Sequence, residues 1–231
     1  MQTKLKVKLL AHTPNADKLV AAAAKLCYAR SDVDTLLDNL TADKVEDFIE
    51  RLADLGHESP IEHASYTFAV EGVSRALLAQ LTRHRIASYS VQSQRYVDKA
   101  DFDYVIPPSI EGNDEAEDTF NRCMMMIDLC YQELCKIGIP AEDARFVLPN
   151  ACDTRIIFTM NARSLHNFFK LRCCHRAQWE IRAMADEMLR LCREVSPMLF
   201  RRAGASCEAT GKCSEGAMCC GEPRGRQEVN R

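Results

Sequence analysis

Residues 64–97 read ASYTFAVEGVSRALLAQLTRHRIASYSVQSQRYV, and this stretch decides the fold. Apolar and polar residues alternate over 64–73, which predicts a strand. Ser74 is a residue type that favours the first position before a helix, and the spacing of apolar residues predicts that helix over 74–84. Residues 89–97 alternate again and are rich in β-formers. The stretch therefore predicts a strand, a helix and a second strand in succession.

The same two periodicities extend over the rest of the chain and predict an α+β fold. The helical patterns place apolar residues, including Cys123, Cys130, Cys135 and Cys192, where we expect them to be buried. Gly56 is expected to end one of the helices. Further strands are predicted at 4–10 and 153–160, and helices at 16–28, 43–55, 116–134, from Pro140, 162–171 and 177–195.

Composition bounds the function. The 231 residues and 47% hydrophobic content fit one main domain at 1–202, followed by a Cys- and Gly-rich tail at 203–231. A net charge of −3 argues against a dedicated DNA-binding protein, so no nucleic-acid partner is expected. No signal peptide and no apolar run of about 18 residues is apparent, so we expect a cytoplasmic protein with no membrane partner.

Glycine is scarce outside the tail. Of the nine glycines, only Gly56, Gly72, Gly112 and Gly138 precede residue 201, and each is isolated. No glycine-rich phosphate loop can be written with them. Any phosphate-bearing ligand must therefore be held by side chains.

Polar side chains are densest between residues 80 and 96. In a helix over 74–84, Gln80, Arg83 and His84 would share one face. In an extended strand, Ser93 and Arg95 would lie on one face and could bind one phosphate or carboxylate. Arg83 and Arg85 would point apart, which favours two ligands, or one ligand and a neighbouring subunit. Arginines here could also simply complement the negative end of a helix dipole.

The order Arg83-His84-Arg85-x-x-Ser88-x-x-x-x-Ser93-x-Arg95 resembles the signature of flavin-dependent thymidylate synthases at every fixed position. The similarity extends upstream through HESPIEH at 57–63. Downstream it includes NARSL at 161–165 and AQWE at 177–180, so it covers nearly all of 1–200.

This resemblance implies a homotetramer with shared active sites and a mostly antiparallel sheet packed with helices. It implies reductive methylation of dUMP to dTMP, with methylenetetrahydrofolate as the one-carbon donor and NADPH-reduced FAD as the hydride source. Arg172 matches the arginine that activates the uracil ring. The implied FAD-binding residues are His57, Ser59, Arg83, His84, Arg85, Asn161, Arg163 and Asn167. The implied dUMP-binding residues are Gln80, Arg83, Ser93, Gln94, Arg95, Arg145 and Arg172.

One position departs from the family, and two rival chemistries arise within the main domain. Val91 stands where many relatives carry a polar residue, so no side-chain role is assigned to it. The segment 57–63 matches neither arrangement of a zinc-protease helix, and no catalytic metal is expected. Cys173 and Cys174 precede a histidine and an arginine and could be nucleophiles, but a structural role is favoured.

A non-enzymatic alternative uses the same arginines, with Tyr89 or Tyr96, to bind nucleotides or RNA. It predicts a colourless protein, whereas the enzyme is expected to be yellow. The tail poses a separate question, because its four thiols could hold zinc or be free in a flexible segment. These thiols belong to Cys207, Cys213, Cys219 and Cys220.

Overall fold

The computed structural model describes residues 2–225 and divides the chain into two compact units. Unit 1 contains the N-terminal residues up to Lys6, together with Ala69–Arg83 and Tyr89–Ile157. Unit 2 contains Val7–Phe68, His84–Ser88 and the chain from Phe158 onward. Each unit combines segments that are distant in the sequence. Residues 226–231 of the predicted tail lie outside the described residues.

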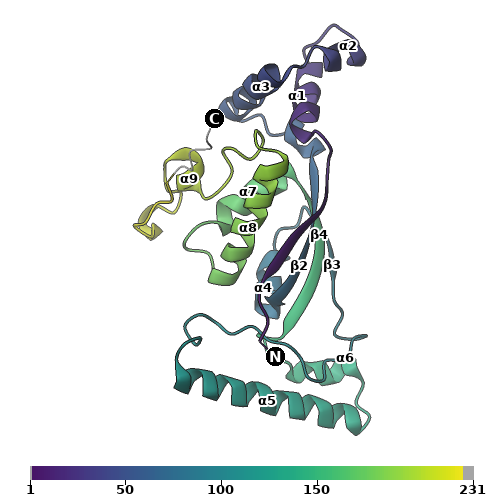
Figure 1. The fold of residues 1–231 in the computed structure, drawn as a ribbon, viewed down its shortest axis with the longest axis vertical. Helices are drawn as coiled ribbons and strands as arrows, with labels where there is room; N and C mark the ends of the chain where they lie inside the picture. The colour runs from purple at the N-terminus through teal and green to yellow at the C-terminus, as the bar shows by residue number, and fades with distance from the viewer. Residues whose placement is uncertain (1, 226–231) are drawn as a thin grey trace. The chain divides into compact units, whose positions relative to one another are not determined.

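Four strands form one antiparallel sheet in the order β1-β2-β4-β3. Strands β2, β4 and β3 are labelled in Figure 1. The central strands β2 and β4 bury alternate side chains, such as Tyr66 and Phe68 on β2 and Phe158 and Met160 on β4. This period-2 burial is what the sequence pattern predicts for a sheet covered on one face. The α+β class and the antiparallel sheet are confirmed. The strands are β1 (Lys6–His12), β2 (Ser65–Ser74), β3 (Ser88–Val91) and β4 (Asp153–Asn161).

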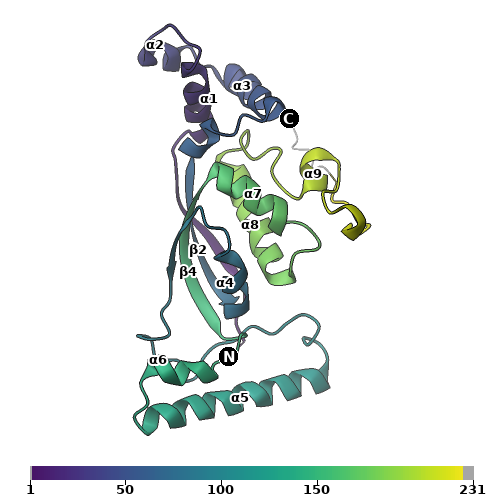
Figure 2. The same ribbon diagram turned by 180° about the vertical axis from the view of Figure 1, so that it is seen from behind.

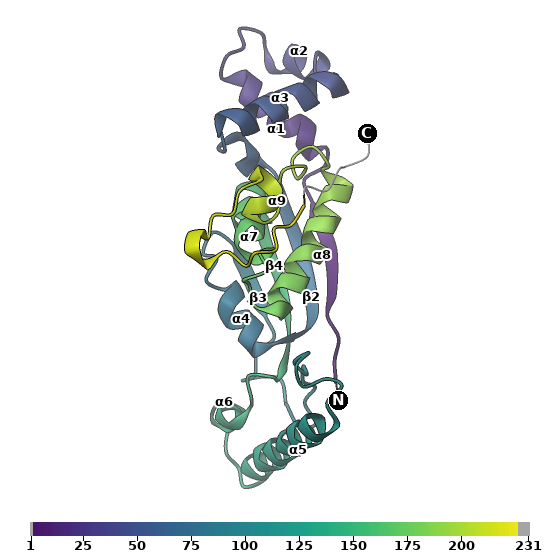
Figure 3. The ribbon, with the colours of Figure 1, turned by 90° about the vertical axis from the view of Figure 1, so that its left-hand side faces the viewer.

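In unit 2, helices α7 and α8 lie on the same side of the sheet (Figures 1 and 3). Their buried side chains include Phe168, Phe169 and Met184, and the Phe200 ring packs edge-on against both Phe169 and Tyr66. Each fully buried side chain of this size contributes about 1.5–3 kcal/mol. The unit-2 helices are α1 (Ala16–Leu26), α2 (Val33–Asp38), α3 (Ala42–Leu55), α7 (Ala162–Arg172), α8 (Trp179–Val195) and α9 (Ser206–Thr210), with short 3₁₀ helices η1 (Pro60–His63) and η3 (Gly216–Met218).

In unit 1, a separate small core forms around Phe102, Met124 and Cys152. Tyr104 and Phe120 pack against it, with ring centroids 6.0 Å apart. Figure 2 shows α6 beside one end of α5. The unit-1 helices are α4 (Arg75–Leu81), α5 (Asp114–Lys136) and α6 (Ala141–Ala144), followed by the 3₁₀ helix η2 (Arg145–Val147).

Local capping explains where several elements begin and end. The Ser74 hydroxyl accepts a hydrogen bond from the Leu77 amide at 3.1 Å and opens α4, as predicted. The Asn161 side chain accepts one from the Ser164 amide at 2.9 Å and opens α7. Gly56, with a φ of 66°, ends α3, as predicted.

The apolar stripe predicted on α5 is only partly buried. Within α5, Met124 and Tyr131 are buried, whereas Cys123 and Cys130 are exposed and Cys135 is half-buried. The expectation that Cys123 and Cys130 are buried is therefore wrong for this chain. Periodicity identifies an apolar helix face but not what covers that face. Cys192 on α8 is buried, as predicted.

Among residues 2–225, no helix is both long enough and apolar enough to cross a membrane.

Candidate functional site

A cleft of about 890 Å³ in unit 2 is the candidate ligand site. Its volume falls within the range typical of small-molecule and cofactor sites. Four segments line the cleft: the region of η1, the loop after α4, one face of α7, and the chain from residue 202 to 214. Its lining is rich in charged and amide side chains.

Helix α7 supplies the central part of this lining. Arg163, Asn167 and Lys170 follow one another at i, i+4 and i+7, so they share a face of the helix. Leu165 and Phe168 lie on the buried side. The predicted cofactor residues Asn161, Arg163 and Asn167 therefore all line the cleft. The same spacing could have identified Lys170, which the sequence analysis missed.

Two carboxylates of the η1 region face Arg163. Its Nε donates to Glu58 Oε2 at 3.1 Å, and its Nη1 donates to Glu62 Oε1 at 2.5 Å. These hydrogen bonds, the one to Glu62 foremost, raise the pKa of Arg163 further. Glu58 and Glu62 lie in the HESPIEH segment of the family resemblance, but neither was among the predicted site residues.

His57 and Ser59, predicted as cofactor residues, have exposed side chains that do not line the cleft. Their backbones instead hold local structure. The His57 amide donates to the Leu52 carbonyl at 3.0 Å at the end of α3, and the Ser59 carbonyl accepts from the Glu62 amide at 3.2 Å.

The predicted helix over 74–84 is too long, because α4 ends at Leu81. The Tyr89 hydroxyl donates to the Leu81 carbonyl at 2.9 Å, and burial raises the pKa of Tyr89 to about 12. The Thr82 hydroxyl donates to the Leu78 carbonyl at 3.0 Å. The Tyr89 bond satisfies a carbonyl that continuation of the helix would have used. Gln80, Arg83 and His84 therefore do not share a helical face.

His84 and Arg85 lie in the loop after α4 and line the cleft, whereas Arg83 is exposed at the end of a unit-1 segment. Arg172, in the last turn of α7, donates from Nε to His84 Nε2 at 3.0 Å. Because Nε2 accepts here, the neutral His84 ring carries its proton on Nδ1. The ring also packs edge-on against Phe168, with centroids 4.9 Å apart. The end of α7 and the RHR motif are thus joined.

A second cluster of predicted residues forms in unit 1, around a turn rather than a strand. Strand β3 ends at Val91, and the Val97 amide donates to the Ser93 carbonyl at 3.1 Å. The prediction of an extended strand over 89–97 is therefore wrong beyond Val91. Within the turn, the Ser93 hydroxyl accepts from the Arg95 amide at 3.1 Å, so the two predicted residues remain adjacent.

Glu142 on α6 brings Arg95 and Arg145 together. Its carboxylate accepts from Arg95 Nε at 3.0 Å, and its backbone carbonyl accepts from Arg145 Nε at 3.0 Å. The Arg95 guanidinium also lies 5.4 Å from the centre of the Tyr96 ring. Two of the residues predicted to bind dUMP, distant in the sequence, therefore meet at one place in unit 1.

Gln94 and Gln80 are placed differently from the exposed arginines. Gln94 is buried, and its Nε2 donates to Cys152 Sγ at 3.7 Å, which is a packing role in unit 1. Gln80 is half-buried in the last turn of α4.

The cysteines near Arg172 do not have the environment of nucleophiles. Cys173 is fully buried, and burial raises the pKa of its thiol, so the reactive thiolate is disfavoured. Cys174 is half-buried. The structural interpretation of this pair is the one that the burial favours.

The four tail cysteines do not assemble a zinc site. Cys213, Cys219 and Cys220 are exposed and Cys207 is half-buried. Across the described part of the chain, no three His, Cys, Asp or Glu side chains are grouped so that they could hold a metal ion. Their placement therefore lends no support to the structural zinc that their number suggested, which stays a prediction.

The fold and the two clusters define a class: an α+β protein with arginine, histidine and amide side chains gathered where they could bind an anionic ligand. Comparison with known proteins then identifies the family. The family described as thymidylate synthase complementing protein matches residues 8–198.

Curated relatives and a solved structure agree. The chain is 53% identical over 220 residues to the flavin-dependent thymidylate synthase of Geobacter sulfurreducens, covering 94% of each chain. It is 49% identical over 242 residues to that of Nitratidesulfovibrio vulgaris, covering 99% of each. The crystal structure of a UMP/dUMP methylase, PolB, from Streptomyces cacaoi bound with 5-Br dUMP has a TM-score of 0.76. That match is 26% identical and covers 86% of this chain and 93% of the other.

The chain belongs to the family of flavin-dependent thymidylate synthases. It is therefore an enzyme, and the alternative of a module that only binds RNA is set aside.

Proposed function

We propose that this chain converts dUMP to dTMP in nucleotide biosynthesis, with methylenetetrahydrofolate as one-carbon donor and NADPH as reductant of bound FAD. Family membership supports the reaction. The observation that carries its assignment to particular residues is the 3.0 Å hydrogen bond from Arg172 to His84 at the edge of the cleft.

The donor set of the cleft suits FAD. His84, Arg85, Asn161, Arg163 and Asn167 offer cations and amides, which are the groups needed for a pyrophosphate and a flavin ring when no glycine nest exists. His57, Ser59 and Arg83 are retained as predicted contacts, although their side chains are exposed. When bound, FAD supplies the hydride, and the protein contributes orientation and electrostatics.

The unit-1 cluster suits the phosphate of dUMP. The Arg95–Glu142 ion pair is about half exposed, with side chains 51% and 50% accessible. Such a pair contributes only about 0–1 kcal/mol, so a phosphate dianion can replace the Glu142 carboxylate on Arg95. Arg145 and the Ser93 hydroxyl lie beside it to complete the site. Gln80, Arg83 and Gln94 remain further predicted dUMP contacts. Gln94 would contribute by its packing in unit 1.

Arg172 is the proposed catalytic residue. Its guanidinium stays protonated at any working pH and can stabilise negative charge that develops on the pyrimidine ring. The hydrogen bond to His84 holds the Arg172 guanidinium in one direction, and the last turn of α7 sets the position of the Arg172 backbone. His84 therefore orients the charge that Arg172 supplies.

The proposed assembly is a homotetramer with shared active sites, in the cytoplasm. The residues proposed for FAD lie mainly in unit 2 and those for the dUMP phosphate in unit 1. The α5 helix exposes Met125, Met126 and Leu129, and these residues are 58%, 56% and 53% accessible. Apolar surface of this kind is typical of a protein–protein interface.

An absorption spectrum followed by a turnover assay tests the proposal. Purified protein should show the bands of a flavin, which NADPH bleaches under anaerobic conditions. Addition of dUMP and methylenetetrahydrofolate should then restore the bands and yield dTMP. A flavin-loaded protein that oxidises NADPH but forms no dTMP would contradict the proposed reaction.

A further inference from the structure

The C-terminal segment forms one wall of the flavin cleft. Ser206, Thr210 and Lys212 line the cleft together with residues of α7 and of the loop after α4. The family model matches residues 8–198, so this wall lies outside the matched range. The tail predicted as a separate region at 203–231 thus contributes directly to a site in unit 2.

A buried ion pair holds the wall in place. Glu208 on α9 accepts from Arg193 Nη2 on α8 at 2.9 Å, and the two side chains are only 7% and 17% accessible. Arg193 also donates to the Ala203 carbonyl at 2.8 Å. Gly204 has a φ of +136°, and a Cβ there would lie 2.5 Å from Glu208 Oε2. The glycine therefore gives the Glu208 carboxylate the room to reach Arg193.

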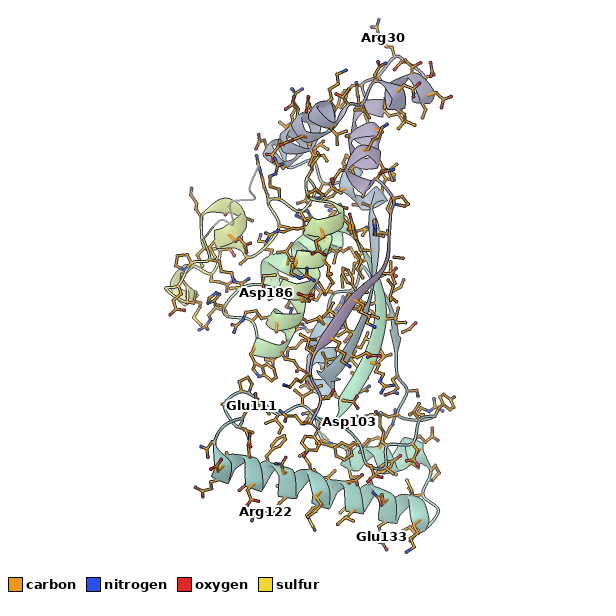
Figure 4. All side chains as sticks on the ribbon, viewed as in Figure 1. Arg30, Asp103, Glu111, Arg122, Glu133 and Asp186 are labelled. Atoms are coloured by element: carbon orange, nitrogen blue, oxygen red, sulfur yellow. The ribbon has the colours of Figure 1, made fainter. Side chains whose placement is uncertain are left out.

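A second ion pair fastens the chain further along. Arg224 donates from Nη1 and Nη2 to the two carboxylate oxygens of Asp186, both at 2.6 Å. Asp186 lies on α8 and is labelled in Figure 4. This two-pronged geometry is the strongest form of an arginine–carboxylate pair. The wall is therefore anchored to α8 on both sides of residues 209–214.

The loop between these anchors is closed by hydroxyl groups. The hydroxyls of Ser206 and Ser214 are 2.8 Å apart, and the Thr210 hydroxyl donates to the Ser206 carbonyl at 2.8 Å. The Lys212 amide donates to the Thr210 hydroxyl at 3.3 Å. These contacts fix the backbone of Lys212 at the rim of the cleft.

Some cationic side chains of the cleft are paired with carboxylates, and others are not. Arg163 is paired with Glu58 and Glu62, and Arg202 with Glu50 and Asp54. Within residues 2–225, no carboxylate forms an ion pair with the other cleft cations. These are Arg85, Lys170 and Lys212. The cleft therefore carries positive charge that a bound anion must balance.

We propose that Lys212, on the wall formed by residues 203–214, binds the pyrophosphate of FAD together with Lys170. This inference rests on the proposed function, because FAD is its ligand. The pyrophosphate is the anionic group of FAD, and this cleft offers it no glycine nest. Lysine is well suited here because it acts as a mobile point charge on a flexible stem.

Charge reversal at Lys212 tests the proposal. In Lys212→Glu the dissociation constant for FAD, measured by fluorescence titration of the apoprotein, should rise by about tenfold or more. Lys212→Arg should stay within about threefold of the wild type because it keeps the charge. The matched control is Lys18→Glu, since Lys18 is an exposed residue of α1 outside the cleft, and it should leave the constant unchanged.

Two further measurements distinguish a direct contact with FAD from a merely structural role of Lys212. They are the effect of salt on the FAD dissociation constant and the KM for NADPH. The difference between wild type and Lys212→Glu should shrink as ionic strength rises, because the lost contact is electrostatic. The KM for NADPH should be unchanged. A dissociation constant for Lys212→Glu within twofold of the control, or an effect on the KM for NADPH alone, would overturn the assignment. Failure of the wild type to form dTMP while it binds FAD would instead count against the proposed reaction.

Discussion

At the scale of single residues, chemistry depends on how one group orients another. Arg172 and His84 are 88 positions apart in the sequence, yet one hydrogen bond of 3.0 Å joins them. The motif containing His84 was evident in the sequence, and Arg172 came from the family resemblance. Their direct contact could not be predicted, because it depends on the end of α7 meeting the loop after α4.

Arg172→Ala should separate binding from catalysis. We expect the variant to retain FAD, because the other cleft residues remain, and to lose about 10²–10³-fold in kcat. Retention is checked by the flavin absorbance per protein, and kcat by dTMP formation. An Arg172→Ala protein with wild-type kcat would show that this guanidinium does not stabilise the reacting ring.

The environment of His166 leads to a prediction of how folding stability depends on pH. Its ring stacks on Phe200, its Nε2 donates to the Leu199 carbonyl at 2.9 Å, and burial lowers its pKa. Below about pH 6.5 the unfolded chain binds a proton that the folded chain rejects. Stability from this residue is therefore full above pH 6.5 and falls on acidification, by at most about 1.4 kcal/mol per pH unit.

The measurement is urea unfolding of the wild type and His166→Gln between pH 7.5 and 5.5. The wild type should lose more of its free energy of unfolding over this range than His166→Gln does. Parallel losses in the two proteins would show that His166 titrates alike in the folded and unfolded states.

At the scale of elements, local signals predicted most of the fold. The strands β1, β2 and β4 and the helices α1, α3, α7 and α8 lie within a few residues of their predicted positions. The predictions that were wrong concern where an element ends and which face of a helix is buried. Helix α4 ends early because the Tyr89 hydroxyl reaches back to its carbonyl, and the 89–97 strand stops where Ser93 begins a turn. Both depend on contacts that periodicity does not encode.

The backbone conformation of Gly72 leads to a prediction about the stability of the sheet. It has a φ of +68°, and a Cβ there would collide with the backbone carbonyl of Lys4. Gly72→Ala should therefore lower the free energy of unfolding by at least about 2 kcal/mol, through backbone strain and loss of this close approach. Thermal unfolding followed by circular dichroism measures the effect. Ala69→Gly in the same strand is the control, with an expected loss of only about 1 kcal/mol.

At the scale of the whole molecule, the exposed face of α5 bears on assembly. Met125 and Leu129 are four residues apart on this helix and are both more than half exposed. The stripe that the sequence pattern predicts on this helix includes neither residue, and periodicity gives no sign that another subunit is the proposed cover of this face.

Leu129→Glu tests whether another subunit covers this face of α5. A buried charge at a subunit contact is strongly unfavourable, so the variant should shift from the proposed tetramer to smaller species and lose activity in proportion. Sedimentation velocity measures the change. Lys18→Glu, at an exposed position of α1, should leave the assembly unchanged. A fully tetrameric Leu129→Glu protein would exclude this face from the interface.

The central claim is that this chain methylates dUMP by a flavin-dependent route, and single-turnover conversion of dUMP tests it most directly. Protein loaded with FAD and reduced by one equivalent of NADPH is mixed anaerobically with dUMP and methylenetetrahydrofolate, and nucleotides are separated by chromatography. We predict about one equivalent of dTMP per reduced flavin, with reoxidation of the flavin at the same rate. Unchanged dUMP alongside a flavin that stays reduced would contradict the claim.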